Sequence, residues 1–258
     1  MTTSASEIRL TALDGIPQVQ PGDDLAAMLG DALARETPVL VDQDVLVVSQ
    51  KIVSKAENRY VSLRDVRPSA KALHLAQETD KDAALIELIL AESTAILRHR
   101  PGLVISRHNL GMVMANAGID QSNVVDDGHG PRVLLLPLDS DGTALTLHDR
   151  LCKQFGIHLA IIIADSAGRA WRHGITGLAL GAAGLPALTD LRGELDLEGR
   201  PLAVSLTGFA DQIACAAQLL MGEAAEGRPA ILIRGLSWQG ASNPARDLIR
   251  PPEQDLFR

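Results

Sequence analysis

The chain has 258 residues, which is enough for one large domain or two small ones with a substantial apolar core. Hydrophobic residues make up 46% of it and the formal net charge is -8, which argues against a general nucleic-acid binder because such a protein needs a basic face. Cys152 and Cys215 are too few for a disulfide framework or a cysteine-rich zinc site, so we expect a reducing compartment, with the cytoplasm as the default.

The first residues lack the cationic and apolar regions of a secretory signal. No apolar run approaches the ~20 residues that cross a bilayer. We therefore expect a soluble protein without a membrane partner.

Short apolar runs alternate with helical patterns along the chain. The runs predict strands over residues 44–49, 103–106, 133–136, 159–164 and 230–234. A helix is predicted over residues 79–98, because Thr79 and Asp82 fit a capping box and an apolar face follows, formed by Leu85, Leu88, Ile89 and Ile96.

A second helix is predicted over residues 207–221, where small side chains form a narrow stripe that would allow close packing: Ala210, Ile213, Ala214, Ala217 and Leu220. Glycine-rich residues 126–132 and 174–199 predict irregular connections, and the second is long enough to suggest a functional excursion. The tail over residues 242–258 contains three prolines and cannot form a continuous helix, and it would wrap either its own surface or a partner subunit.

The most informative segment is residues 115–123, a loop of small and polar residues that leads to Asp120, with the Asn123 amide three residues later. Hard cations prefer oxygen ligands, and phosphates accept hydrogen bonds from amides. The pair is therefore suited to hold a divalent metal beside phosphate oxygens.

A second acidic position follows the predicted strand over residues 159–164. Asp165 and Ser166 fall at its carboxyl end, where open sheets commonly place ligand sites. A turn or helix start would put Arg169 and Arg172 on one side, where they could bind a carboxylate or phosphate of the substrate. The alternative is that Asp165 caps the next element and the arginines form solvated ion pairs.

Lys51 and Lys55 come just after another predicted strand. If that segment turns into a helix, the spacing of four places both amines on one face, where they could neutralise a triphosphate. A solvated surface is the alternative. The chain has no P-loop and no Asn-Lys-x-Asp segment, and the glycines over residues 177–184 lack the spacing of a dinucleotide loop.

Histidines form no compact zinc pattern, and most are expected to be surface or packing residues: His74, His99, His148 and His158. His108 and His173 lie near proposed site segments, so contact with an anionic substrate stays open for both. Trp171 is expected either to stack on a ring system or to anchor the following loop by packing.

Five ordered segments, at residues 15–17, 49–57, 115–123, 165–177 and 210–222, together resemble the coenzyme F420-0:L-glutamate ligase family, which adds glutamate to a deazaflavin coenzyme. The family has threonine where Ser166 stands and often proline where Ala170 stands. The resemblance implies an α+β fold with mixed sheets and packed helices, distinct from P-loop and Rossmann folds. It also implies one ligase unit over residues 1–258, with two intertwined lobes left open, and without the carboxy-terminal nitroreductase-like domain of some bacterial relatives.

The resemblance assigns roles residue by residue. Asp120 and Asp165 match ligands of one divalent ion, and Ser166 and Glu223 match positions around a second. The matches to the nucleotide site are Gly15, Ile16, Pro17, Gln18, Gln50, Lys51, Lys55, Asn123, Met221, Gly222 and Arg228. The implied ions are Mn²⁺ or Mg²⁺, as one or two ions, with a K⁺ requirement left open.

The implied reaction is GTP-dependent. A substrate carboxylate attacks the γ-phosphate, and the amine of glutamate then displaces phosphate from the acyl phosphate, with further γ-linked additions. Because the substrate is itself the nucleophile, no catalytic triad is required. The resemblance also implies a homodimer. The rival functions are a metal-dependent phosphohydrolase or nucleotidyltransferase, and a non-catalytic nucleotide sensor, which would be expected to have lost a metal acid.

Overall fold

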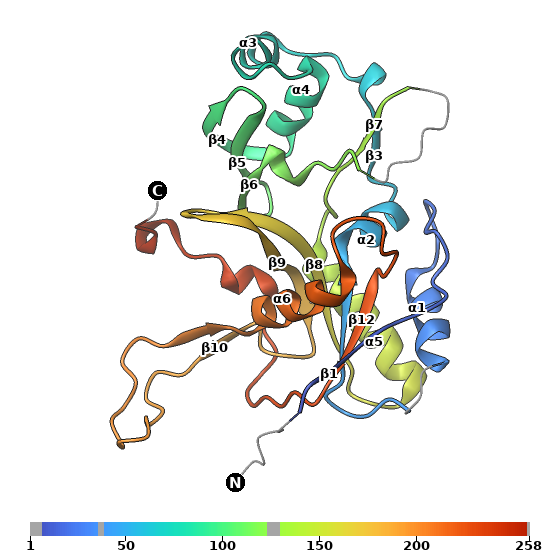
Figure 1. Ribbon diagram of the computed structural model, residues 1–258, viewed down its shortest axis with the longest axis vertical. Coiled ribbons are helices and arrows are strands. Elements are labelled where there is room, and N and C mark those ends of the chain that lie inside the picture. The colour runs from blue at the N-terminus through green and yellow to red at the C-terminus, as the bar shows by residue number, and fades with distance from the viewer. Residues whose placement is uncertain (1–6, 36–38, 123–129, 257–258) are drawn as a thin grey trace.

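The computed structural model describes residues 7–35, 39–122 and 130–256. Its larger part is built on a five-stranded sheet with the order β1-β12-β2-β8-β9 (Figure 1). The five strands are β1 (Arg9–Ala12), β12 (Ala230–Arg234), β2 (Val45–Ser49), β8 (Ala160–Arg169) and β9 (Arg172–Ala183). Only β2 and β8 are parallel neighbours, and the other pairs are antiparallel, so the sheet is mixed.

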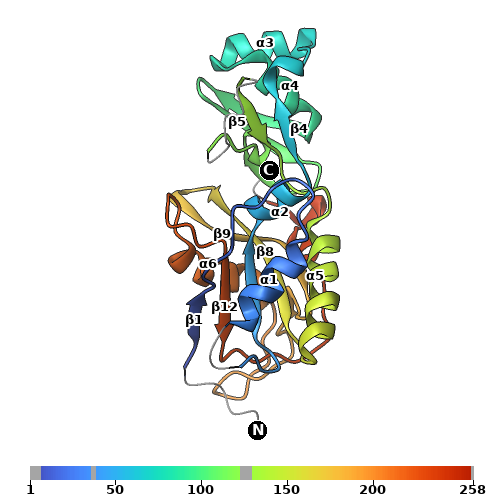
Figure 2. The same cartoon turned by 90° about the vertical axis from the view of Figure 1, so that its right-hand side faces the viewer.

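Helices cover both faces of this sheet (Figure 2). On one face, α1 (Leu25–Ala34) and α5 (Ser140–Phe155) bury leucines and alanines against β2 and β8. On the other face, the small residues of α6 (Phe209–Met221) pack against the sheet. The strands between these layers read as continuous apolar runs because both of their faces are buried.

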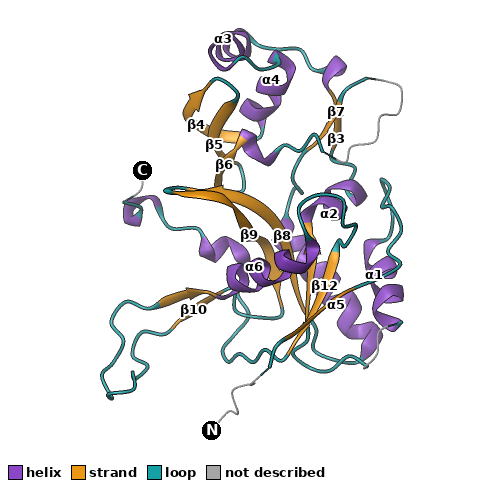
Figure 3. Cartoon of the chain, viewed as in Figure 1, coloured by secondary structure: helices purple, strands orange, loops and turns teal. Residues whose placement is uncertain are grey.

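A smaller part lies above the sheet in Figure 3 and has its own apolar core. Its helices are α3 (Ala70–Thr79) and α4 (Ala83–Ala91). Its strands are β4 (Ser93–Arg100), β5 (Leu103–His108) and β6 (Val113–Ala115), which form one sheet, and β3 (Tyr60–Ser62) and β7 (Arg132–Leu134), which form another. Short 3-10 turns are η1 (Leu63–Asp65) and η2 (Asn116–Gly118).

An arm projects from the larger part and is formed by β10 (Leu188–Asp190) and β11 (Leu206–Gly208) (Figure 1). After β12, the chain passes through two 3-10 turns, η3 (Ala245–Leu248) and η4 (Pro252–Gln254). The expectation that the tail forms no continuous helix is therefore confirmed, and η3 packs on the chain's own β9.

The predicted helix over residues 79–98 is wrong in extent. Asp82 caps α4 by accepting hydrogen bonds from the backbone amides of Ala84 and Leu85, whereas Thr79 ends α3. Residues 93–100 form β4, which pairs with β5 across a turn at Gly102 with a φ of +82°. The Pro-Gly dipeptide at this turn is a hairpin signal, and long-range pairing overrides the helical spacing.

The predicted irregular connection over residues 174–199 is also wrong, because most of its first half is β9. Glycines in β9 serve close packing: a Cβ at Gly177 would lie 2.4 Å from the Ala214 carbonyl oxygen of α6. A Cβ at Gly181 would lie 2.2 Å from the Ser140 carbonyl oxygen of α5. The other glycine-rich loop, residues 126–132, lies mostly outside the described residues.

Candidate functional site

Four of the sequence segments that were assigned to a site converge at one edge of the large sheet. Ser49 pairs with Ala164 in the parallel β2–β8 ladder, so both strands end there. The Ser49 amide donates to the Pro229 carbonyl at 2.8 Å, which places the start of β12 at the same edge. The Leu13 amide donates to the Ala230 carbonyl at 3.0 Å and brings in the segment after β1. Carboxyl ends of parallel strands are where open sheets bind ligands.

Asp165 lies just beyond the buried part of β8. A bulge between Ile163 and Ala164 shifts the register with β9, and bulges commonly re-aim side chains at sites. Burial raises the pKa of Asp165 to about 6, the charge of Asp120 adds to this rise, and hydrogen bonds from the Ser166 backbone and Gln50 oppose it. Asp165 caps no helix, because β8 continues to Arg169.

Asp120 follows three successive residues with left-handed backbone, Asn116, Ala117 and Gly118, at φ values of 49°, 53° and 65°. Such strain in non-glycine residues is found where surrounding structure fixes a site loop. Lys51 Nζ lies 2.6 Å from Asp120 Oδ2. Ser122 donates to Asp120 Oδ1 through its amide at 2.6 Å and its hydroxyl at 2.7 Å.

Burial raises the pKa of Asp120, but the hydrogen bonds from Lys51 and Ser122 outweigh burial and hold the pKa below its ordinary value. Asp120 is therefore charged at neutral pH. The charge of Asp120 adds to the raised pKa of Asp165, so these two acids from separate segments interact electrostatically.

The segment after residue 49 does form a helix, α2 (Gln50–Ala56), which carries Lys51 and Lys55. Burial lowers the pKa of Lys55, and repulsion from Lys51 adds to this, while Asp120 opposes it. Gln50 is buried and accepts a hydrogen bond from Ser54 Oγ at 2.9 Å. Lys51 is thus paired with an acid, both lysines are partly buried, and their contact with a nucleotide stays a prediction.

The other predicted nucleotide residues border this edge. Gly15 has a φ of 70°, and its carbonyl accepts from Arg35 Nη2 at 3.3 Å. Ile16 packs on the core beneath α1, whereas Pro17 and Gln18 are exposed. Asn123 lies outside the described residues.

At the other end of the predicted nucleotide segment, the Met221 side chain is buried under α6, so only its backbone is available to a ligand. Gly222 follows as the C-cap. Arg228 is exposed and donates to the Leu220 carbonyl at 3.4 Å.

The predicted metal residue Glu223 and the predicted substrate residues Arg169 and Arg172 form no hydrogen bond or ion pair with Asp120 or Asp165 within the described residues. Glu223 is exposed and accepts from Gln218 Nε2 at 2.5 Å. Arg169 and Arg172 are cross-strand partners at the tip of the β8–β9 hairpin, and Arg169 lies four residues beyond Asp165, roughly 13 Å along the strand. Their assigned roles stay predictions.

Trp171 occupies the turn of this hairpin with a φ of 65° and is 89% exposed, so the expectation that it anchors a loop by packing is wrong. His173 beside it is also exposed.

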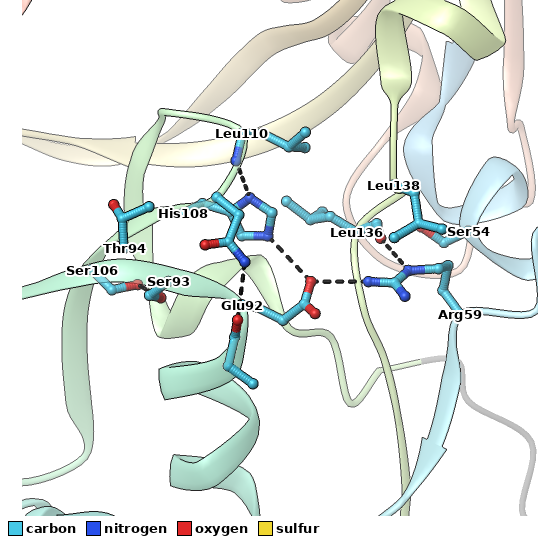
Figure 4. Close-up of polar contacts among 12 residues, drawn as sticks. Ser54, Arg59, Glu92, Ser93, Thr94, Ser106, His108, Leu110, Leu136 and Leu138 are labelled. Carbon is cyan, nitrogen blue, oxygen red and sulfur yellow. Dashed lines mark hydrogen bonds and ion pairs between the residues drawn. The ribbon is translucent and has the colours of Figure 1, made fainter.

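A polar network connects the segment after α2 with the smaller part of the molecule (Figure 4). Arg59, just after α2, donates to the Leu136 carbonyl at 2.8 Å and to Glu92 Oε2 at 2.9 Å. His108 Nε2 lies 3.6 Å from the same oxygen, and His108 Nδ1 accepts from the Leu110 amide at 3.0 Å. His108 is 2% exposed, so its side chain is enclosed within this network.

Among the described residues, no group of three or more histidine, cysteine or acidic side chains could hold a metal. The site offers two carboxylates and nearby hydroxyls, a donor set that fits Mg²⁺ or Mn²⁺, because Mg²⁺ is usually held by one or two carboxylates, waters and substrate phosphates. No helix in the described part of the chain is long and apolar enough to cross a membrane.

Residues 15–235 match the family described as F420-0:Gamma-glutamyl ligase. The chain is 43% identical to the coenzyme F420:L-glutamate ligase of Methanothermobacter thermautotrophicus, over 97% of this chain and 99% of that protein. It is 42% identical to the protein of the same name from Methanopyrus kandleri, over 93% of this chain and 94% of that protein. The protein of the same name from Archaeoglobus fulgidus is 38% identical, over 97% of this chain and 96% of that protein.

The chain has a mixed α+β fold without a P-loop, and acids and lysines lie together at one edge of its large sheet. Such a site is suited to charged substrates. Together with the matches over nearly the whole chain, it shows that the chain belongs to the F420-0:gamma-glutamyl ligase family. The resemblance drawn from the five ordered segments is thereby confirmed.

Sequence reasoning did not find Arg59 or Glu92, and it gave Asp211 no role of its own. No local pattern marks Arg59 and Glu92 as partners, because they lie 33 positions apart and meet only in the folded chain. Asp211 reads as an ordinary acid at a helix start.

Proposed function

We propose that the protein joins L-glutamate to the deazaflavin precursor coenzyme F420-0 in a GTP-dependent reaction that forms GDP. The observation that carries the proposal is the meeting of Lys51, Asp120 and Asp165 at the sheet edge, in a chain of this family. Charges of both signs at one edge suit a triphosphate and the cation that accompanies it.

The chemistry proceeds in two steps. An oxygen of the precursor carboxylate attacks the γ-phosphorus, the bond to the bridging oxygen breaks, and GDP leaves with that electron pair. The glutamate nitrogen then attacks the acyl carbon, the carbon–oxygen bond to phosphate breaks, and inorganic phosphate and one proton are released. Further γ-linked glutamates would be added by repeating both steps.

In this reaction the chain contributes position and charge. Lys51 and Lys55 neutralise phosphate oxygens, and the Lys51 ammonium also fixes the Asp120 carboxylate. Asp120 and Asp165 would hold a divalent ion, with Ser166 and Glu223 near a second. When bound, Mg²⁺ or Mn²⁺ would neutralise charge on the phosphates. K⁺ is left as a further candidate ion.

We further propose that the protein is a cytoplasmic homodimer that binds neither nucleic acid nor membranes. Free cysteines at positions 152 and 215 suit a reducing compartment. The arm carries exposed apolar side chains that a second copy could cover: Leu195, Leu197, Val204 and Leu206. Size-exclusion chromatography with light scattering tests the dimer.

The function is tested by incubating the protein with F420-0, L-glutamate, GTP and Mn²⁺ or Mg²⁺, and detecting glutamyl products by mass spectrometry. We expect product only when all components are present, and less with ATP in place of GTP. GTP turnover without glutamate and without amide product would instead indicate a phosphohydrolase or nucleotidyltransferase. GTP binding without turnover would indicate a sensor.

A further inference from the structure

A cavity of about 390 Å³ lies along β9, one of the two edge strands of the large sheet. Its apolar wall comes from the β5–β6 turn, β6 and β9 and includes Leu110, Met112, Val113, Leu178 and Leu180. Its polar wall comes from the starts of α5 and α6 and from the C-terminal segment. Small-molecule sites run from about 300 to 1,000 Å³, so this size favours a small metabolite over the deazaflavin precursor.

Asp211 supplies a carboxylate to the polar wall. It lies in the first turn of α6, and Asp211 Oδ1 accepts a hydrogen bond from the Ala179 amide at 2.9 Å. Burial raises the pKa of Asp211, and within the described residues no cation forms an ion pair with it. A half-buried carboxylate without a counter-ion is stabilised by a ligand that brings a positive charge.

Three other acids line this cavity, Asp139, Asp141 and Asp255, and each already interacts with another part of the chain. Asp139 caps α5 by accepting from the Gly142 amide at 3.0 Å. Asp141 accepts from the amides of Ala182 and Ala245 at 3.0 and 2.8 Å. Asp211 is therefore the acid in this group that is suited to receive an ammonium group.

Two guanidinium groups, of Arg246 and Arg250, line the same cavity. Arg246 lies 3.5 Å from Asp141 with its side chain 68% exposed, so it retains N–H groups for a further partner. Guanidinium groups bind carboxylates with paired hydrogen bonds. Asp211 and Arg246 match the ammonium group and one carboxylate of an α-amino acid, and Arg250, which already interacts with another residue, adds positive charge to the same wall.

The cavity also borders the candidate active site. Leu178 on its wall is the cross-strand partner of Asp165, and neighbouring strands lie about 4.8 Å apart. We propose that this cavity is the subsite for the amino-acid substrate of the proposed ligase, with Asp211 receiving the ammonium group and Arg246 receiving a carboxylate. A bound amine would then lie one strand away from the acids that flank the triphosphate. The assignment rests on the proposed function for the identity of that substrate.

The test compares L-glutamate with glutarate, which has both carboxylates but no amine. In calorimetric titrations of the full-length wild-type protein, we expect glutarate to bind at least about 10-fold more weakly. The Asp211→Asn variant keeps a hydrogen-bond acceptor for the Ala179 amide but loses the charge. We expect it to bind glutamate about 10- to 100-fold more weakly and to lose the preference over glutarate.

Ligation kinetics on the same variant should show a raised KM for glutamate with an unchanged KM for GTP. Glu198→Gln, which removes an exposed acid from the arm, is the matched control and should leave both unchanged. Arg246→Ala, at a largely exposed position, should also raise the KM for glutamate, and it serves if Asp211→Asn does not fold.

Equal binding of glutamate and glutarate by the wild type would overturn the subsite, as would an unchanged KM for glutamate in Asp211→Asn. Ligation with an unchanged KM would reject the subsite while leaving the ligase function intact. Glutamate binding that depends on Asp211, without any ligation product, would support the subsite and reject the ligase function.

Discussion

The ammonium of Lys51 lies 2.6 Å from the carboxylate of Asp120, although the two residues come from segments almost 70 positions apart. This pair joins α2 to the segment that follows the strained turn η2 and brings a cation and an acid together at the sheet edge. Burial raises the pKa of Asp165 on β8, and the same carboxylate of Asp120 adds to this rise. Three segments of the chain thus form one electrostatic unit.

Replacing Lys51 tests the role of that cation. Lys51→Ala should lower kcat/KM for GTP by about 100- to 1,000-fold, because a positioned charge on a phosphate is lost. Steady-state kinetics with GTP as the varied substrate provide the measurement. Lys71→Ala, at an exposed position on α3, is the control and should behave like the wild type. Equal kinetics for the two variants would show that Lys51 does not contact the nucleotide.

Packing of β9 against α6 gives a prediction about stability. Gly177→Ala should lower the free energy of unfolding by about 1–3 kcal/mol or more, since its Cβ would lie 2.4 Å from the Ala214 carbonyl oxygen. Gly168→Ala in the same hairpin has nothing within 4 Å of its Cβ and should change stability little. Urea unfolding of both variants measures this, and a stable Gly177→Ala variant would argue against the close approach of α6.

The Glu92 network predicts a pH dependence of stability. His108, with Arg59, outweighs burial and holds the pKa of Glu92 below its ordinary value of 4.5. A lowered folded-state pKa means that the stabilisation is present above the unfolded-state pKa and is lost as the pH falls through the folded-state value. Glu92→Gln should therefore lower the free energy of unfolding by about 1–3 kcal/mol at pH 7 and by progressively less below pH ~4.

Urea unfolding at a series of pH values measures this difference, with Glu253→Gln on the exposed tail as the control. If Glu92→Gln lowers the free energy of unfolding equally at pH 7 and at pH ~3, the assigned ion pairing of Glu92 is contradicted.

Local patterns in the sequence predicted those parts of the fold that depend on local chemistry. The strand over residues 230–234 has the predicted bounds, and the small-residue stripe of α6 is buried as expected. The helix over residues 79–98 was wrong because its second half pairs with β5, a long-range interaction that helical spacing does not reveal. The glycines of β9 predicted a loop because their packing partners, α5 and α6, lie far away in the sequence.

In the candidate site, too, local patterns predict some residues, whereas other features depend on how the chain folds. Asp165 was predictable because it follows a buried apolar run, and Lys51 and Lys55 because they are spaced along a short helix. The direct pairing of Lys51 with Asp120 was not predictable, since only the folded chain brings the two segments together. The cavity beside Asp211 depends on five separate segments and has no counterpart in any local pattern.

The central claim is that Asp120 and Asp165 together hold a divalent cation against the triphosphate. The most direct test is Mn²⁺-dependent ligation by wild type, Asp120→Asn and Asp165→Asn, each checked for folding by circular dichroism. Loss of at least about 100-fold in rate is expected for both variants, with wild-type secondary structure retained. Ligation at the wild-type rate by both folded variants would contradict the claim.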